Sequence, residues 1–526
     1  MAIRLLSIII FAVLISPVLN SKEIIHLTPG TTARTQNTYD TYVTFVTLNA
    51  LPSAYAPADI QESALVTLFQ QKKFTGTLKQ SCAFTSFDNA TPVTHLFVGM
   101  GAMNGAPQEQ AENARRAAGI MVQQLKSFKS SLALLSFPES IINTPNAAYV
   151  IGQALIAARL AAYEFDDFKS SKEASSSIEL MLDIPEALRT HSEITAAPVI
   201  AEATNTARWL GLLPPNICNP VFLAEFAKTK AAALNCRCTV LGKKAAAKLG
   251  MGGFNAVGGG SASKNKFIVV EYLGGKEGTA PIALVGKGVT FDSGGLCIKT
   301  AQGMLDMKYD MCGGAAVLTT VFALAQLKTP VNVIAIVPAV ENMLSSTSYR
   351  ASDIVTFLNG KTAEIINTDA EGRVILADGL AYAEKYYSPS LIIDVATLTG
   401  ACITALGSYY IGMMTRNEQL VEKITTAGLS SGDYVWRLPL SDNYKAGIVS
   451  DFADIANLGK SGAGATYAAM FLENFVEKTP WVHLDIAGAA FNVSGISYFN
   501  PTYCTGAAVR LLIDFITKST ADERTT

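Results

Sequence analysis

The sequence predicts an α/β protein built from an N-terminal α/β domain and a larger α/β domain with a mainly parallel central sheet. The chain has 526 residues, and a domain commonly holds roughly 100–200. Hydrophobic residues make up 49% of it, enough for a large buried core, and its 40 glycines are typical of proteins with many tight strand-to-helix turns. Continuous apolar runs alternate with helical patterns, which favours parallel strands covered by helices.

The smaller domain is predicted over residues 22–190. Apolar runs at 94–101 and 132–137 are typical of buried strands, and residues 109–128 between them carry apolar side chains at helical spacing. The polar, serine-rich residues 171–178 are expected to form a loop.

The larger domain is predicted over residues 191–526. Helices are expected over 195–211 and 372–386. Continuous apolar runs indicate strands that are covered on both faces, and in such a sheet ligands bind at the carboxyl ends of the strands. The predicted strands are 281–286, 332–339, 362–367, 391–397 and 481–488.

The first 21 residues resemble a secretory signal peptide. Arg4 precedes the apolar run 5–19, and a polar segment follows it. A membrane-spanning helix needs roughly 20 apolar residues, so this run is short for one. We therefore expect export to the periplasm or the medium after cleavage near Asn20 or Ser21, with an uncleaved membrane anchor or a cytoplasmic protein as the alternatives.

Composition limits the other partners. The formal net charge is −2 and no long basic run occurs, so we expect no nucleic acid partner. No later segment is long and apolar enough to span a membrane, so no stable membrane partner is expected. The eight cysteines are scattered, which argues against a disulfide framework. The four histidines are widely spaced, so any metal site must consist mainly of carboxylates.

Seven charged residues follow the predicted strands 281–286 and 362–367, at the strand ends where a site is expected. Four carboxylates can bridge and balance two divalent cations, and two such cations can activate a water molecule. A lysine amine can bind a metal if its pKa is strongly lowered, while further cations can stabilise an oxyanion. Spacing alone does not name the reaction. The seven residues are Lys287, Asp292, Lys299, Asp310, Asp369, Glu371 and Arg373.

Several longer strings in this region are similar to signatures of the leucyl aminopeptidase family of metalloexopeptidases. The strings VGKGVTFDSGG at 285–295 and NTDAEGR at 367–373 match it, as do KYDMCG at 308–313 and ATLTGA at 396–401. The similarity covers roughly residues 200–500. It implies a two-metal aminopeptidase that releases N-terminal amino acids, preferably leucine-like ones, from peptides.

The resemblance also implies a role for each charged residue. Lys287, Asp292, Asp310, Asp369 and Glu371 would bind two divalent ions, zinc or manganese or both. Among these ligands, Asp292 and Glu371 would bridge the two ions. Lys299 and Arg373 would be the catalytic cations, and Arg373 would hold a bicarbonate that serves as general base.

A substrate pocket and an assembly follow from the same resemblance. The expected assembly is a homohexamer, formed as a dimer of trimers. All charged positions are filled, which favours an active enzyme over a relative kept for a structural or binding role. His483, in the predicted strand 481–488, is expected to be structural. Asp485 in the same strand is expected to lie near the site, in a structural role or as a support for the site residues. The pocket would be lined by Met307, Asn367, Thr397, Leu398, Gly400, Ala487 and Ala490.

Overall fold

The computed structural model describes residues 25–28, 39–49, 61–88, 91–171 and 177–525. The predicted signal peptide, residues 1–21, lies outside the described residues, and so do residues 172–176 of the predicted loop. Among the described helices, none combines the length and the apolar character needed to cross a membrane.

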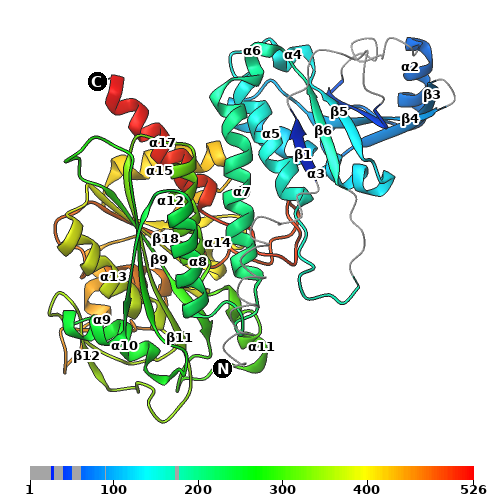
Figure 1. The fold of residues 1–526 in the computed structure, drawn as a ribbon. Helices are drawn as coiled ribbons and strands as arrows, with labels where there is room; N and C mark the ends of the chain where they lie inside the picture. Colours follow the sequence, from blue (N-terminus) through cyan, green and yellow to red (C-terminus); the bar gives the residue numbers. More distant parts are fainter. Residues whose placement is uncertain (1–24, 29–38, 50–60, 89–90, 172–176, 526) are drawn as a thin grey trace, which may run out of the picture. The chain divides into compact units, whose positions relative to one another are not determined.

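The chain forms two compact units, each with its own large sheet (Figure 1). The first unit comprises Met1–Asn205 and Ser494–Asn500, and the second comprises Thr206–Val493 and Pro501–Thr526. Both are α/β, which confirms the predicted fold class. Helix α7 (Ser192–Leu212) runs across the boundary between the units, and the domain limit at residues 190 and 191 stays a prediction.

The first unit contains a six-stranded sheet in the order β1-β6-β5-β2-β4-β3, in which only β3 is antiparallel to its neighbour. The strands are β1 (Ile25–Thr28), β2 (Thr41–Thr47), β3 (Ser81–Asp88), β4 (Thr91–Gly101), β5 (Leu132–Ser136) and β6 (Ile178–Asp183). The helices are α2 (Glu62–Gln71), α3 (Pro107–Phe128), α4 (Glu139–Ile142), α5 (Ala147–Ala162) and α6 (Glu186–Arg189), together with the start of α7.

Helix α3 confirms the helix predicted over 109–128. Pro107 stands at its first turn, where a missing amide hydrogen costs nothing, and Lys129 ends it in a left-handed conformation. Buried side chains recur at helical spacing, for example at Ala114, Ala118 and Val122. This apolar face packs against α5 and the strands β2 and β4.

A short segment from late in the chain completes the first unit. The Ser497 hydroxyl donates to the backbone oxygen of Arg116 at 2.7 Å, and the Gln123 amide donates to the Ser497 oxygen at 3.1 Å. Gly119 faces this segment so closely that a Cβ there would lie 2.6 Å from the Ser497 carbonyl carbon. Tyr498 is buried in the same core. The first unit is therefore assembled from two distant stretches of sequence.

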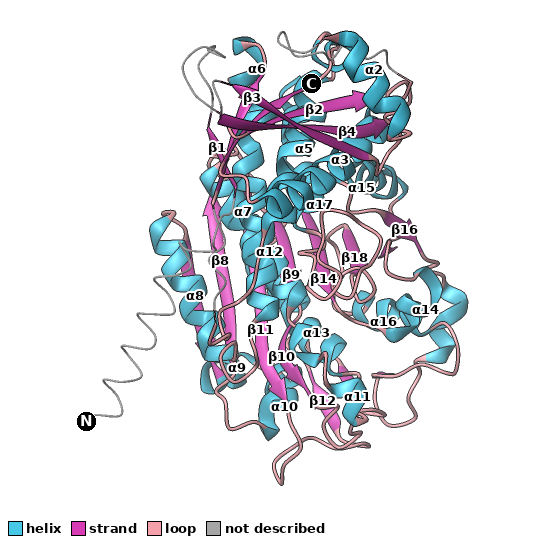
Figure 2. Cartoon of the chain, turned by 90° about the vertical axis from the view of Figure 1, so that its right-hand side faces the viewer, coloured by secondary structure: helices cyan, strands magenta, loops and turns pink. Residues whose placement is uncertain are grey.

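The second unit is organised around a nine-stranded sheet (Figure 2). Its order is β16-β15-β18-β14-β9-β11-β8-β7, and β10 pairs with β11. The neighbours β18, β14, β9 and β11 are parallel, as predicted, while β7, β8 and β15 add antiparallel pairs. The strands are β7 (Arg237–Gly242), β8 (Lys266–Leu273), β9 (Ile282–Gly286), β10 (Gly288–Asp292), β11 (Asn332–Asn342), β14 (Leu391–Ala396), β15 (Ile411–Met414), β16 (Val435–Arg437) and β18 (Trp481–Asp485).

Helices cover both faces of this sheet, which explains why its central strands are continuous apolar runs. On β9, Val285 faces α13, where a Cβ on Gly379 would meet it, whereas Gly286 faces Val317 of α12. The α-helices of this unit are α8 (Pro220–Ala233), α9 (Lys243–Leu249), α10 (Gly252–Val257), α11 (Ala301–Met304), α12 (Cys312–Gln326), α13 (Glu371–Tyr387), α14 (Gly400–Leu406), α15 (Glu418–Ser431), α16 (Gly464–Glu473) and α17 (Val509–Thr525), besides the end of α7. Three short 3₁₀ helices are η3 (Gly258–Gly260), η4 (Met307–Tyr309) and η5 (Asp442–Gly447).

One predicted strand is placed differently in the structure. The apolar run 362–367 gives only β13 (Thr362–Glu364), which pairs with β12 (Ile354–Thr356) and β17 (Ile455–Ala456) in a separate three-stranded sheet. The backbone leaves the strand because the Ile366 amide donates to the Asn457 side chain at 2.7 Å, and the Ile366 side chain is 44% exposed.

Candidate active site

The charged residues predicted from the sequence come from loops and helix starts at one end of the central sheet. Lys287 joins β9 to β10; its amide donates to the Val395 oxygen at 3.0 Å, and its oxygen accepts from the Gly314 amide at 2.8 Å. Asp292 ends β10, beside Asn342 at the end of β11. Hydrogen bonds and strand pairing fix the backbone around Lys287 and Asp292, so the side chains of these two residues have little freedom to move apart.

Helix α13 supplies further members of the group at its first turn. Glu371 is the first residue of this helix and Asp369 precedes it. Gly372 allows the helix start to approach Lys287, since a Cβ there would lie 2.6 Å from the Lys287 Cε. The close approach therefore requires a glycine beside Glu371.

Six of the seven charged residues form one cluster, in which Lys299 and Asp369 are partly exposed and the other four are buried. Lys287 Nζ lies 2.7 Å from Asp310 Oδ1 and 2.9 Å from Glu371 Oε1. Lys299 Nζ lies 2.8 Å from Asp292 Oδ2 and also contacts Asp369. Oxygens of three carboxylates lie within 4.8 Å of one another, an arrangement that can hold a metal ion: Asp292, Asp369 and Glu371.

Arg373, the seventh charged residue, is buried next to this cluster. Its Nη1 donates to the Asn457 backbone oxygen at 3.1 Å. Among the described residues, no hydrogen-bond acceptor faces its buried Nε. Part of its donor fork is thus available to another group.

The cluster is rich in negative charge for a buried place. Burial, together with the nearby Asp292 carboxylate, raises the pKa of Glu371 to about 8, although Lys287 opposes this. Burial also raises the pKa of Asp310 to about 6 against the effect of Lys287. Four carboxylates face two lysines here, so the cluster favours added positive charge.

The pKa of Lys287 is raised in the structure. Burial alone would lower this pKa, but the carboxylates of Asp310 and Glu371 outweigh it. The amine of Lys287 could bind a metal only with a lowered pKa, and such a shift needs cations beside it.

Sequence reasoning missed the amides and hydroxyls that hold the cluster in place. Asn342 Nδ2 donates to Asp292 Oδ1 at 2.8 Å and to the Thr368 oxygen at 2.9 Å. The Tyr349 hydroxyl donates to the same Thr368 oxygen at 2.7 Å. The available signal for Asn342 was its place shortly after the predicted strand 332–339. For Asn457, which shapes the 366–370 turn, the sequence offers none.

The predicted pocket residues divide into two groups. Thr397 and Asn367 use their side chains to bond residues of the cluster, since the Thr397 hydroxyl donates to Asp310 Oδ1 at 2.9 Å and Asn367 Oδ1 accepts from the Asp369 backbone amide at 2.7 Å. The other five have no hydrogen bond to a charged side chain of the cluster within the described part of the chain. They are Met307 in η4, Leu398 after β14, Gly400 at the start of α14, and Ala487 and Ala490 after β18.

His483 is fully buried and hydrogen-bonded, as expected for a structural histidine. Its Nδ1 lies 2.6 Å from Asp394 Oδ1, and Trp481 Nε1 donates to Asp394 Oδ2 at 2.7 Å. The two rings are stacked. Asp394 of β14 is thus bonded to Trp481 and His483 of β18.

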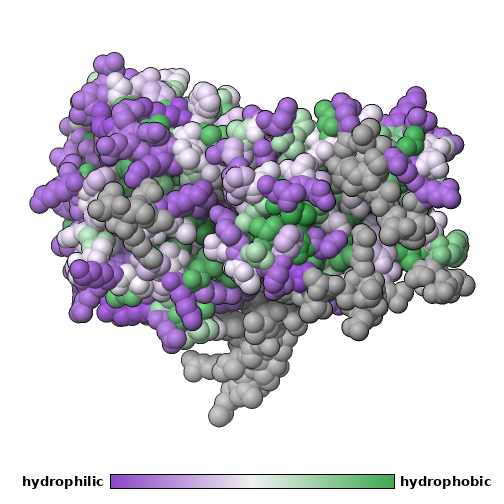
Figure 3. All heavy atoms as spheres, turned by 90° about the horizontal axis from the view of Figure 1, so that it is seen from above, coloured by the Kyte–Doolittle hydropathy of each residue, from purple (hydrophilic) through white to green (hydrophobic). Residues whose placement is uncertain are grey.

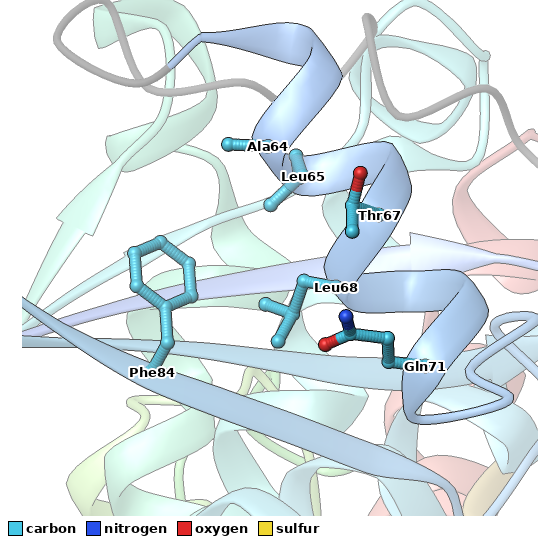
Figure 4. A pocket seen from close by; sticks show the side chains of 6 residues that line it. All are labelled: Ala64, Leu65, Thr67, Leu68, Gln71 and Phe84. Carbon is cyan, nitrogen blue, oxygen red and sulfur yellow. The ribbon is translucent and has the colours of Figure 1, made fainter.

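A separate cavity of about 390 Å³ lies in the first unit between α2 and β3 (Figure 4). Leu65, Leu68 and Phe84 line it, together with Ala64, Thr67 and Gln71. None of its lining residues can supply a charge, so it is unrelated to the charged cluster.

Hydrophilic side chains cover much of the face seen in Figure 3, with smaller apolar areas between them.

Comparisons with known proteins assign both units. The model of the cytosol aminopeptidase family, catalytic domain, matches residues 205–513, and the model of the N-terminal domain of the same family matches residues 45–172. A probable cytosol aminopeptidase of Cenarchaeum symbiosum (strain A) is 43% identical over 421 residues, which cover 79% of this chain and 85% of the relative. One of Pseudomonas syringae pv. syringae (strain B728a) is 40% identical over 471 residues, covering 89% and 93%.

A solved structure agrees with the sequence comparisons. The bottromycin maturation enzyme BotP in complex with Mn matches with a TM-score of 0.80 and 30% identity, over 92% of this chain and all of that one.

The names of the curated relatives contradict the prediction of export, because they are called cytosol aminopeptidases. That prediction was wrong because a short apolar run behind one positive charge is a weak indicator of compartment.

Proposed function

The chain belongs to the cytosol aminopeptidase family of metal-dependent hydrolases, and from this premise we propose that it releases leucine-like N-terminal residues from peptides with the help of two divalent ions. The observation that carries the proposal is the convergence of Asp292, Asp369 and Glu371, whose oxygens lie within 4.8 Å of one another. Two of these carboxylates, Asp292 and Glu371, are buried, and charges so placed need cations to balance them.

The donor set fits divalent metal ions. Asp310 Oδ2 is buried without a hydrogen-bond partner among the described residues, and carboxylate oxygens are ligands that both manganese and zinc accept. Bound ions would polarise the substrate carbonyl and lower the pKa of a water molecule. The manganese complex of BotP supports manganese at this site. The proposed ligands are Lys287, Asp292, Asp310, Asp369 and Glu371.

Lys299 and Arg373 are the proposed catalytic cations. The Lys299 side chain is 17% exposed and contacts the carboxylates of Asp292 and Asp369. An ammonium group at this partly open place can stabilise an oxyanion. Arg373 has a donor that is not used by the described residues, and its planar fork suits bicarbonate. The bicarbonate would accept the proton of the attacking water.

The proposed substrate pocket combines small residues with a few larger walls. Gly400, Ala487 and Ala490 leave room for a branched apolar side chain, while Met307 and Leu398 offer apolar contact. Asn367 and Thr397 connect the pocket to the cluster. This composition supports a preference for leucine-like residues over charged ones.

The test is a panel of aminoacyl substrates, assayed after chelation and again after manganese or zinc is added. We expect hydrolysis of leucyl substrates only with added metal, slower hydrolysis of alanyl substrates, and none of N-acetyl-leucyl substrates. Hydrolysis by protein that elemental analysis finds metal-free, or equal hydrolysis of the N-acetylated substrate, would contradict the proposal.

A further inference from the structure

Asp485 joins the two turns that carry most of the proposed substrate pocket. One turn follows β14 and contains Leu398, and the other follows β18 and contains Ala487. Asp485 Oδ1 accepts from the Leu398 amide and from the Ala487 amide, both at 3.1 Å. A single carboxylate oxygen thus holds the backbone of both turns.

The second oxygen of Asp485 holds the start of α14. Asp485 Oδ2 accepts from the Thr399 hydroxyl at 2.7 Å, while the same hydroxyl oxygen accepts from the Cys402 amide at 3.0 Å. Thr399 is the N-cap of α14, whose first residue is the proposed pocket residue Gly400. Asp485 therefore also determines where this helix begins.

The same turn reaches the charged cluster. Thr397, two residues before Thr399, accepts from Lys287 Nζ through its backbone oxygen at 2.9 Å and donates to Asp310 through its hydroxyl. The Asp485 side chain is fully buried, so its carboxylate interacts with these donors and not with solvent. It links the wall of the pocket to the edge of the proposed metal centre.

We propose that Asp485 is a positioning residue that determines which N-terminal side chains the pocket accepts. The inference rests on the proposed function, because it concerns the pocket of that reaction. A carboxylate is needed because three donors converge on it and it offers only acceptors. An asparagine would keep one acceptor oxygen for Leu398 and Ala487 but would turn an NH₂ group toward Thr399.

The experiment compares Asp485→Asn with Asp378→Asn as a matched control. Asp378 is also fully buried and accepts backbone amides, those of Phe254 at 2.8 Å and Leu358 at 3.0 Å, but these groups are no part of the pocket. The quantity measured is the ratio of kcat/KM for a leucyl substrate to that for an alanyl substrate, together with metal content.

In Asp485→Asn we expect this ratio to fall about 10-fold or more, the scale of discrimination that a shaped apolar pocket provides, with metal content unchanged. Asp378→Asn should keep the ratio of the parent even where its thermal stability falls. Equal ratios in both variants, or loss of metal in Asp485→Asn, would overturn the inference.

Thr399 provides a second variant in case Asp485→Asn does not fold. Thr399→Ala should lower the same ratio, and Thr399→Ser, which keeps the hydroxyl, should restore it; unchanged ratios in both would overturn the inference. A parent that hydrolyses no aminoacyl substrate with any metal would instead refute the proposed function, so the two failures can be told apart.

Discussion

Glu371 and Arg373 lie two residues apart at the start of α13, yet their side chains have different surroundings. Glu371 points into the cluster of carboxylates and contacts Lys287, whereas Arg373 donates to the backbone of Asn457. We propose that Glu371 binds a cation and that Arg373 binds an anion. Substituting each residue should therefore damage a different part of the reaction.

We expect Glu371→Ala to lose metal, because a shared negative ligand is removed. Arg373→Ala should keep its metal and its KM while kcat falls by roughly 10²–10⁴-fold, the usual contribution of a positioned general base. Elemental analysis and steady-state kinetics of both variants and the parent check this. Metal loss in Arg373→Ala, or full kcat, would show that its role is assigned wrongly.

His483 should make stability depend on pH. Burial alone would lower the pKa of His483, but the Asp394 carboxylate outweighs burial and raises it above 6.5. The folded state thus binds a proton more tightly than the unfolded state, so the stabilisation is fully present below pH 6.5 and is lost as pH rises through the folded pKa. Urea unfolding between pH 6 and 9 should show this slope in the parent.

The matched pair for this measurement is His483→Gln and His191→Gln. His191 is exposed, so its variant should follow the parent, whereas His483→Gln should lose the slope above pH 6.5. Parallel curves for His483→Gln and the parent would rule out His483 as the source.

At the scale of elements, helix α12 lies unusually close to the sheet. Gly313 stands in its first turn, and a Cβ there would lie 2.1 Å from the Val395 oxygen. Glycine to alanine normally stabilises a helix by roughly 0.5–1 kcal/mol. We expect Gly313→Ala to destabilise the protein by about 1–3 kcal/mol instead, the usual result of overpacking.

Chemical denaturation of Gly313→Ala and of Gly242→Ala checks this expectation. A Cβ on Gly242 would meet nothing within 4 Å, so that variant should remain within about 0.5 kcal/mol of the parent. A Gly313→Ala variant as stable as the Gly242→Ala control would mean that α12 can move away from the sheet.

The apolar runs of the central strands and the spacing of α3 and α13 could be predicted because burial on two faces or on one stripe leaves a direct pattern in the sequence. The strand predicted over 362–367 is too long. The Ile366 amide donates to the side chain of Asn457, 91 residues away, and so does not pair with a neighbouring strand. The charged residues were found from strand ends and motifs and Asp485 was expected to be structural, whereas the hydrogen bonds that Asn342 and Asp485 make to distant residues were not predicted. Hydrogen bonds between distant residues leave no periodic signal.

At the scale of the whole molecule, the family leads us to propose a homohexamer built as a dimer of trimers. Exposed apolar side chains in the second unit support association, among them Phe452 at 78% and Leu305 at 69% exposed. Light scattering should give six times the mass of one chain, and Phe452→Asp should weaken assembly. A stable active monomer of the parent would contradict the proposal.

The first unit contains Ser494–Asn500, which has a consequence for how the protein is made. A ribosome releases the N-terminal residues first, and domains generally begin to fold in that order. Here the core that receives Tyr498 must wait until nearly the whole chain of 526 residues has been synthesised. During translation the first domain stays incomplete and exposes apolar surface that chaperones can bind. A nascent chain stalled at residue 493 should therefore be more sensitive to protease in its N-terminal half than one stalled beyond residue 500 with the tunnel cleared.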